Sequence, residues 1–187
     1  MEIILASGSP RRRELMQRIT PDYRVEASQV DESGITAPSP AALAGALAAA
    51  KCGDVAARHP RAVVIGCDTV VECGGQVFGK PADAADARRM LQALSGSTHA
   101  VHTGVCIRRG AERVQFTATS RVRFFAIPEQ ELEDYIATAE PYDKAGAYAI
   151  QGRAGLWLDA IDGDYYNIVG FPLSRIAAAL RQFGLQG

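Results

Sequence analysis

The chain opens with an order of residues that permits few structures. The apolar run at residues 3–6 predicts a short buried strand, and Ser7 and Gly8 predict a tight turn directly after it. Ser9 is typical of a helix N-cap, and Pro10 is typical of the first helical position. This end of the chain therefore indicates a strand, a turn and a helix start in immediate succession.

The predicted helix start carries three consecutive arginines: Arg11, Arg12 and Arg13. A helix N-terminus already has partial positive charge and unpaired N–H groups, and neighbouring guanidinium groups also repel one another. A bound anion such as a phosphate chain would compensate this arrangement. The alternative is a solvated basic cluster that merely flanks a helix, because runs of charge usually lie on the surface.

Composition narrows the class of protein. The chain has 187 residues, 48% of them hydrophobic, with 20 basic and 21 acidic residues and a net charge of −1. This balance argues against a general nucleic-acid binder or a membrane-surface protein. No run is long enough for a membrane span, and the start lacks a signal-peptide pattern. The four cysteines show no paired or zinc-type spacing, so we expect a soluble cytoplasmic protein with reduced thiols.

Strand-like and helix-like segments alternate along the chain, which predicts an α/β fold with a mixed sheet. No internal repeat, low-complexity tract or long linker is present, so we expect one domain over residues 1–187. The predicted strands cover residues 23–27, 62–67, 101–107 and 114–125, and the predicted helices cover residues 41–57, 84–94, 128–136 and the segment after Pro172.

Asp68 stands in the middle of an apolar strand pattern, where a carboxylate is costly unless it is paired, metal-bound or chemically used. The glycines at 74–75 predict a two-residue hairpin turn that folds residues 76–80 back along this strand. Extending the ladder from the turn sets Thr69 opposite Lys80, so the Lys80 ammonium is expected close to Asp68. A structural ion pair between paired strands is the alternative interpretation.

Residues 74–80 also fit GxxxxGK, the beginning of a Walker A loop. The next residue is Pro81 instead of Ser or Thr, so the hydroxyl that would hold magnesium is missing. The glycines also lie in a hairpin pattern and not in a strand-to-helix turn. We therefore reject a P-loop.

Residues 140–152 surround two tyrosines with glycines and alanines, which suggests backbone lying close to a ligand. The Gln151 amide can both donate and accept hydrogen bonds, which suits the polar edge of a base. A tightly packed loop without a ligand explains the same residues equally well, and residues 163–172 leave the same two interpretations open.

Together these segments resemble the Maf family of nucleoside triphosphate pyrophosphatases, from Leu5 to about Leu180. The residues that carry the resemblance are Ala6-Ser7-Gly8-Ser9-Pro10-Arg11-Arg12, Asp31-Glu32, Lys51, Asp68-Thr69, Gly79-Lys80-Pro81, Leu94-Ser95-Gly96, His99, Thr103-Gly104-Val105, Asp143-Lys144-Ala145-Gly146 and Ile150-Gln151-Gly152.

The resemblance implies hydrolysis of a nucleoside triphosphate between the α and β phosphates, with a divalent metal cation, Mg or Mn, as cofactor. It implies a mixed twisted sheet flanked by helices, with two lobes and a central cleft, similar to inosine triphosphate pyrophosphatase. The residues at 12, 69 and 151 resemble the branch that acts on dTTP and UTP, and they differ from the branch that acts on 7-methyl-GTP.

The resemblance also implies roles for single residues. Asp68 is implied as the proton acceptor, and Glu32 and Asp68 are hard oxygen ligands for the metal. Contacts to the phosphates are implied for Ser7, Arg11, Arg12, Lys51 and Lys80, and substrate selectivity is implied for Arg12, Thr69 and Gln151.

Two classes of function follow. The first is a pyrophosphatase that limits dTTP and UTP or removes modified pyrimidine triphosphates, with a 7-methyl-GTP enzyme as the related variant. The second is a nucleotide-binding regulator of cell division and septum formation that acts through a partner. A pure binder needs no water-activating carboxylate, so Asp68 favours the enzyme. We expect a nucleotide substrate, no nucleic acid or membrane partner, and the homodimer that many family members form.

Overall fold

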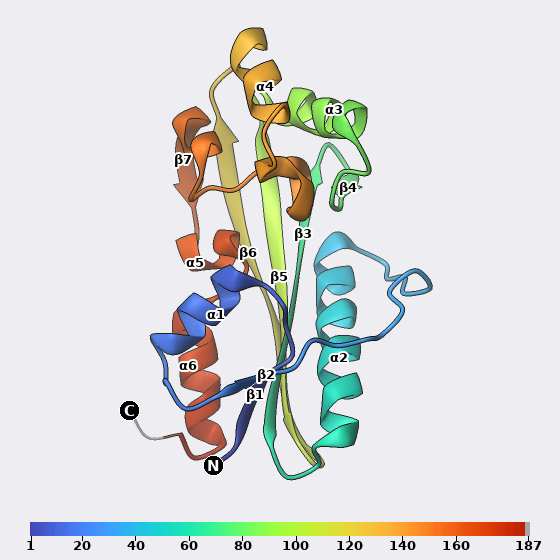
Figure 1. Cartoon of the computed structure of the whole chain (residues 1–187), viewed down its shortest axis with the longest axis vertical. Helices are drawn as coiled ribbons and strands as arrows, with labels where there is room; N and C mark the ends of the chain where they lie inside the picture. Colours follow the sequence, from blue (N-terminus) through green and yellow to red (C-terminus); the bar gives the residue numbers. More distant parts are fainter. Residues whose placement is uncertain (186–187) are drawn as a thin grey trace.

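The computed structural model describes residues 1–185 and contains one seven-stranded sheet (Figure 1). The strand order is β2-β1-β3-β5-β6-β7, and β4 pairs with β3 beside this path. β1 runs parallel to β2 and β3, and the other pairs are antiparallel, so the predicted mixed sheet is confirmed. The strands are β1 (Ile3–Leu5), β2 (Arg24–Val25), β3 (Val63–Cys73), β4 (Gln76–Phe78), β5 (Thr98–Arg109), β6 (Glu112–Phe124) and β7 (Leu158–Asp162).

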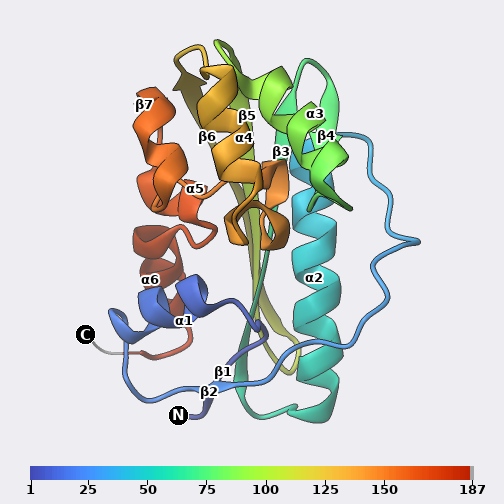
Figure 2. The ribbon, with the colours of Figure 1, turned by 45° about the horizontal axis from the view of Figure 1, so that its top comes forward.

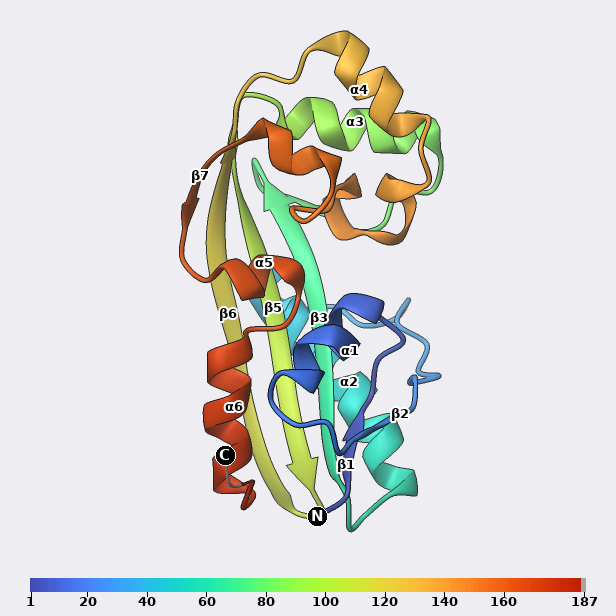
Figure 3. The ribbon, with the colours of Figure 1, turned by 60° about the vertical axis from the view of Figure 1, so that its left-hand side comes forward.

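Helices cover both faces of the lower half of the sheet and close its upper end. Helix α2 lies on one face, and α1 and α6 lie on the other, while α3 and α4 sit at the far end of the long strands (Figures 1 and 3). The helices are α1 (Pro10–Gln17), α2 (Pro40–Arg58), α3 (Ala84–Leu94), α4 (Glu129–Ile136), α5 (Tyr165–Val169) and α6 (Leu173–Gln182), with the 3-10 helices η1 (Glu140–Asp143), η2 (Ala145–Ala147) and η3 (Arg153–Trp157).

The hydrophobic core is divided between a lower and an upper lobe. In the lower lobe, one apolar cluster joins the sheet to α1 and α6, and another joins it to α2. In the upper lobe, a separate cluster joins the ends of β3, β5 and β6 to α3 and α4, which Figure 2 shows packed together. β3, β5 and β6 run through both lobes, so the long strands hold the two halves together.

Local signals in the sequence explain several boundaries. Ser39 caps α2 by accepting a hydrogen bond from the Ala42 N–H at 3.2 Å, and Pro40 occupies the first turn. α3 ends where predicted, before Gly96, whose φ of 63° suits glycine. The strand predicted at residues 23–27 is shorter than expected, because only the two residues of β2 pair with β1.

The predicted hairpin turn at residues 74–75 is confirmed. Cys73 lies opposite Gln76, and Val71 lies opposite Phe78. Both glycines have positive φ, 57° and 82°, as a tight two-residue turn requires. The ladder ends at Phe78, so Lys80 lies beyond it.

All four cysteines are free thiols, and three of them are buried. Within residues 1–185, no helix combines the length and the apolar character that crossing a membrane would need.

Candidate active site

The site lies where one edge of β3 has no neighbouring strand. β1 pairs with β3 only as far as Ile65, and β4 begins to pair at Val71. Between these points no described strand lies along this edge of residues 66–70, and a cleft of about 700 Å³ opens there. Successive side chains of a strand point to opposite faces, so Asp68 and Thr69 enter the cleft from different sides.

On the α2 face, Lys51 joins two carboxylates. Its Nζ donates to Asp68 Oδ1 in a short contact and lies 3.0 Å from Glu32 Oε1. The side chains of Lys51 and Asp68 are only 18% and 13% exposed, whereas Glu32 is 47% exposed. Limited contact with water strengthens the attraction between Lys51 and Asp68 relative to a surface pair. A single cation therefore orients Asp68 from the side of α2.

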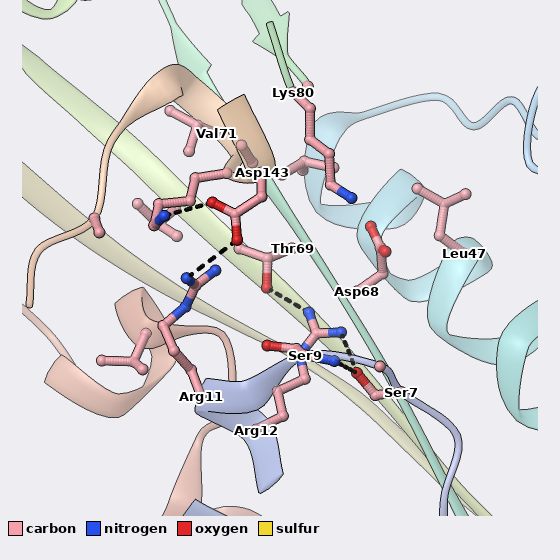
Figure 4. A pocket seen from close by; sticks show the side chains of 18 of the residues that line it. Ser7, Ser9, Arg11, Arg12, Leu47, Asp68, Thr69, Val71, Lys80 and Asp143 are labelled. Atoms are coloured by element: carbon pink, nitrogen blue, oxygen red, sulfur yellow. Dashed lines mark hydrogen bonds and ion pairs between the residues drawn. The ribbon is translucent and has the colours of Figure 1, made fainter. Parts of the chain in front are cut away.

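The predicted register that set Thr69 opposite Lys80 is wrong, because the ladder between β3 and β4 ends at Phe78. Among the ion pairs of the described residues, Asp68 pairs with Lys51 and Lys80 forms none. The alternative interpretation, a structural ion pair between Asp68 and Lys80, is therefore not the arrangement found. Lys80 is exposed, and in Figure 4 its side chain points into the cleft, where it is available to a ligand.

The donors at this place fit a divalent cation together with a phosphate. The carboxylates of Glu32 and Asp68 converge on one positive centre, the Lys51 ammonium. Among the residues that the structure describes, no three His, Cys, Asp or Glu side chains gather closely enough to hold a metal by themselves. Mg²⁺ is often held by one or two carboxylates plus substrate phosphates, so two carboxylates are a sufficient protein contribution.

On the opposite face, Arg12 is engaged by the protein itself. Its Nε donates to the Gly170 carbonyl at 2.9 Å, and its NH1 donates to the Cys67 carbonyl at 2.7 Å. NH2 donates to Thr69 Oγ1 at 3.1 Å, and NH1 is 3.4 Å from Ser7 Oγ (Figure 4). The guanidinium thus takes the place of a neighbouring strand at this edge of β3. It also links Arg12 directly to Thr69, and both residues were predicted to determine selectivity.

Arg11 projects from the same helix toward the upper lobe. Its NH1 lies 3.8 Å from Asp143 Oδ2 in η1, across the cleft (Figure 4). Burial would raise the pKa of Asp143, but the ammonium of Lys144 and the guanidinium of Arg11 hold that pKa below its usual value. Arg11 is therefore a cation at a helix start whose only protein partner in the described structure is a largely exposed carboxylate.

Asp143 and Lys144 also line the cleft, although neither was among the site residues predicted from the sequence. The Lys144 Nζ donates to the Glu140 carbonyl at 2.6 Å and pairs with Asp143. The sequence signal that could have identified them is the Asp143-Lys144-Ala145-Gly146 stretch, which is part of the family resemblance. Nothing in that stretch alone indicates that it meets Arg11 from the other end of the chain.

Gln151 lies in the loop between η2 and η3, where its exposed side chain lines the cleft. The loop is held by Glu140, which accepts a hydrogen bond from the Tyr135 hydroxyl at 3.0 Å and another from the Arg153 N–H at 3.4 Å. Apolar side chains line the same part of the cleft, namely Val71, Val101, Tyr148, Ile150, Ile168 and Val169. A flat heterocycle could lie on this wall with its polar edge toward Gln151.

His99, one of the residues that carry the resemblance, lies behind this wall. Its Nε2 is 2.8 Å from the Tyr148 hydroxyl, and its ring contacts Phe124 edge to face. Burial lowers the pKa of His99 to about 4, so the ring is neutral at physiological pH. His99 therefore supports Tyr148 and takes no direct place in the cleft.

Every residue that the sequence analysis proposed for the site lines this one cleft: Ser7, Arg11, Arg12, Glu32, Lys51, Asp68, Thr69, Lys80 and Gln151. They come from α1, α2, β3 and loops that are far apart in the sequence. The arrangement combines cations for a polyanion, carboxylates for a metal and a water molecule, and an apolar wall with an amide for a base.

Comparison with known proteins agrees with this chemistry. The family model described as Maf-like protein matches residues 2–183. A dTTP/UTP pyrophosphatase of Symbiobacterium thermophilum is 47% identical over 183 residues, covering 98% of this chain and 94% of the relative. That of Bacillus cytotoxicus is 44% identical over 182 residues, covering 97% and 95%. The fold resembles the Staphylococcus aureus Ham1 protein with a TM-score of 0.57 at 17% identity, over 98% of this chain and all of the other.

Proposed function

Because the chain belongs to the Maf-like protein family, we propose that it is a nucleoside triphosphate pyrophosphatase that hydrolyses dTTP and UTP to the monophosphate and pyrophosphate. The names of the relatives from Symbiobacterium thermophilum and Bacillus cytotoxicus support this substrate class. The observation that carries the proposal is the largely buried Asp68 carboxylate, held by Lys51 at the open edge of β3, in a cleft that cations line.

The cations of the cleft bind the phosphate chain. Arg11 exchanges its long contact with Asp143 for a phosphate oxygen, and Lys80, which points into the same cleft, supplies a second cation. Ser7 lies at the turn before α1 and is 7% exposed as a residue, and its hydroxyl adds a neutral hydrogen bond. Attack on the α-phosphorus develops charge on its oxygens, and cations held in place stabilise that charge.

Asp68 activates the attacking water in this proposal. Its Oδ1 accepts from Lys51, and no described residue donates a hydrogen bond to its Oδ2, which is free to accept a proton from water. The divalent metal, Mg or Mn, would be held by Glu32 and Asp68, and when bound it neutralises charge on the phosphates. Lys51 keeps the Asp68 carboxylate in one orientation while the water is deprotonated.

The first test is the identity of the product. We expect dTTP and UTP to release pyrophosphate in the presence of Mg²⁺ or Mn²⁺ and to release none after the metal is removed with a chelator. Separate assays for pyrophosphate and orthophosphate make the measurement. Orthophosphate as the primary product would place cleavage at the γ-phosphate and contradict the proposal.

Selection of the base is assigned to Gln151. Its amide can pair with the O4 and N3 edge that uracil and thymine share, and the anchored loop holds it beside the apolar wall. A base bound on the apolar wall covers the Gln151 amide, and a covered amide that the base leaves unpaired costs roughly 1–3 kcal/mol.

Replacing Gln151 with glutamate removes the amide donor. We expect Gln151→Glu to lower kcat/KM for UTP and dTTP by about 10- to 100-fold, which corresponds to the same range of free energy. The control is Gln92→Glu, the same change at an exposed position on α3. Measuring kcat/KM for UTP, dTTP, CTP and GTP in the three proteins makes the test. An unchanged ranking in Gln151→Glu would remove Gln151 from base selection.

We further propose that the chain works in the cytoplasm as one domain, which its four free cysteines support. Assembly as a homodimer, and the absence of nucleic-acid and membrane partners, stay predictions.

A further inference from the structure

Two glycines in the sheet lie directly beneath α2. The ladder between β3 and β5 places Gly104 opposite Asp68 and Gly66 opposite Cys106. Gly66 and Asp68 are two residues apart and therefore share a face of β3, the face that α2 covers. Gly104, the residue opposite the proposed general base Asp68, thus has no side chain.

The backbone of α2 occupies the space that a side chain at these positions would need. A Cβ on Gly104 would lie 2.1 Å from the Ala44 carbonyl oxygen and 2.5 Å from the Gly45 nitrogen. A Cβ on Gly66 would lie 2.5 Å from the Ala48 carbonyl oxygen. These neighbours are backbone atoms of a helix, so they cannot turn aside as a flexible side chain can.

This close approach determines how near Lys51 comes to Asp68. Lys51 lies two turns beyond Ala44 on the same continuous helix, so a displacement of α2 at the sheet moves Lys51 with it. Three other charged residues of the cleft lie outside α2. Glu32 is in the loop before α2, Arg11 is in α1, and Lys80 follows β4. The distance of α2 from the sheet therefore affects the position of Lys51 more directly than the positions of the other cations of the cleft.

We propose that Gly104, together with Gly66, is a positioning residue for catalysis: it lets α2 lie close enough to the sheet for Lys51 to orient Asp68. The inference rests on the proposed role of Asp68. It goes beyond that role because it gives a positioning function to the glycine of the Thr103-Gly104-Val105 stretch. This glycine contacts helix backbone and does not itself line the cleft.

Gly104→Ala is the direct test. The Ala44 oxygen would have to retreat from 2.1 Å to the 3.4 Å at which ordinary contact begins, and α2 would move with it. Displacements of about 1 Å in a catalytic arrangement can cost about 100-fold in rate, so we expect kcat for UTP to fall by about 10- to 100-fold. KM should change less than about threefold, because the phosphate contacts of Arg11 and Lys80 come from other elements.

The matched control is Gly53→Ala on the same helix. Apart from the adjoining residues and the nearby backbone of α2 itself, no atom lies within 4 Å of the Cβ that this substitution adds. Alanine is also the better helix former, so the variant should be slightly more stable and equally active. It separates an effect of the sheet contact from an effect of altering α2.

A double-mutant cycle shows whether Gly104 acts through Lys51. Lys51→Met removes the ammonium and keeps an unbranched side chain. In that background Gly104→Ala should lower kcat by less than about threefold further, because the contact it disturbs is already absent. A crystal structure of Gly104→Ala should also show Lys51 Nζ withdrawn beyond about 4 Å from Asp68, outside ion-pair distance.

Three results would overturn the inference. One is a folded Gly104→Ala variant with normal kcat, and another is the same loss of rate with and without the Lys51 ammonium. If Gly104→Ala does not fold, Gly66→Ala carries the same test, and failure of both to fold would reduce the glycines to a requirement of the fold. Failure of the proposed function is seen separately, as absence of pyrophosphate release by the unaltered protein.

Discussion

Asp68→Asn should lower the turnover of UTP by at least about 100-fold, the scale expected when a general base is lost. The amide keeps the shape of the carboxylate but can neither take a proton nor carry the negative charge that Lys51 and a metal would meet. The fold should survive, because the side chain is not enclosed in a hydrophobic cluster and part of it faces the cleft. Rates at saturating substrate, with circular dichroism for the fold, make the measurement.

Asp162→Asn is the matched control for this variant. Asp162 lies on β7 and is 85% exposed, with its nearest cation, Arg121, 4.0 Å away. The substitution there should leave both rate and stability unchanged. If the Asp68 variant folds and retains most of its activity, Asp68 is only a structural partner of Lys51 and a different group activates the water.

The sequence predicted those parts of the site that depend on local order. The helix start at Pro10 and the turn at residues 74–75 each follow from neighbours in the chain, and the structure confirms both, with Ser9 at the N-cap position but without a capping hydrogen bond from its side chain. Such signals are short-range because a cap or a two-residue turn involves only a few consecutive residues.

The cation beside Asp68 was not predictable in this way. Counting along the hairpin led to Lys80, which is near in sequence, whereas the true partner is Lys51 on α2. The distance of α2 from the sheet depends on Gly66 and Gly104, and no local pattern shows that these glycines meet helix backbone. Contacts between elements decide such pairs, and a single sequence does not display them.

Arg12 shows the same gap between a residue type and its role. An arginine at a helix start indicates an anion site, yet this guanidinium is taken up by the protein. It donates hydrogen bonds to the carbonyls of Cys67 and Gly170 and to the hydroxyl of Thr69, three groups that are brought together only by the fold. Arg12 can reach these groups because no described strand covers this edge of β3 between Ile65 and Val71. The sequence did not indicate this gap.

We therefore expect Arg12→Lys to destabilise the protein as well as impair it. A lysine ammonium is a single point with three donors and cannot span the positions that the guanidinium reaches. At least one of the carbonyls of Cys67 and Gly170 loses its partner, and each such loss in a partly buried place costs about 1–3 kcal/mol. The free energy of unfolding should fall by about 2–3 kcal/mol, and kcat/KM for UTP should fall with it.

Urea unfolding of Arg12→Lys beside Arg13→Lys measures this difference. Arg13 is the exposed neighbour on the same turn of α1, and its side chain makes no hydrogen bond or ion pair to the described residues, so its replacement should be neutral. If Arg12 served mainly as a phosphate ligand, Arg12→Lys would keep full stability and only raise KM, because lysine also binds phosphate. A loss of stability with no bound nucleotide instead identifies Arg12 as the group that closes the open edge of β3 and holds Thr69 in place, since an empty cleft contains no phosphate whose loss could explain it.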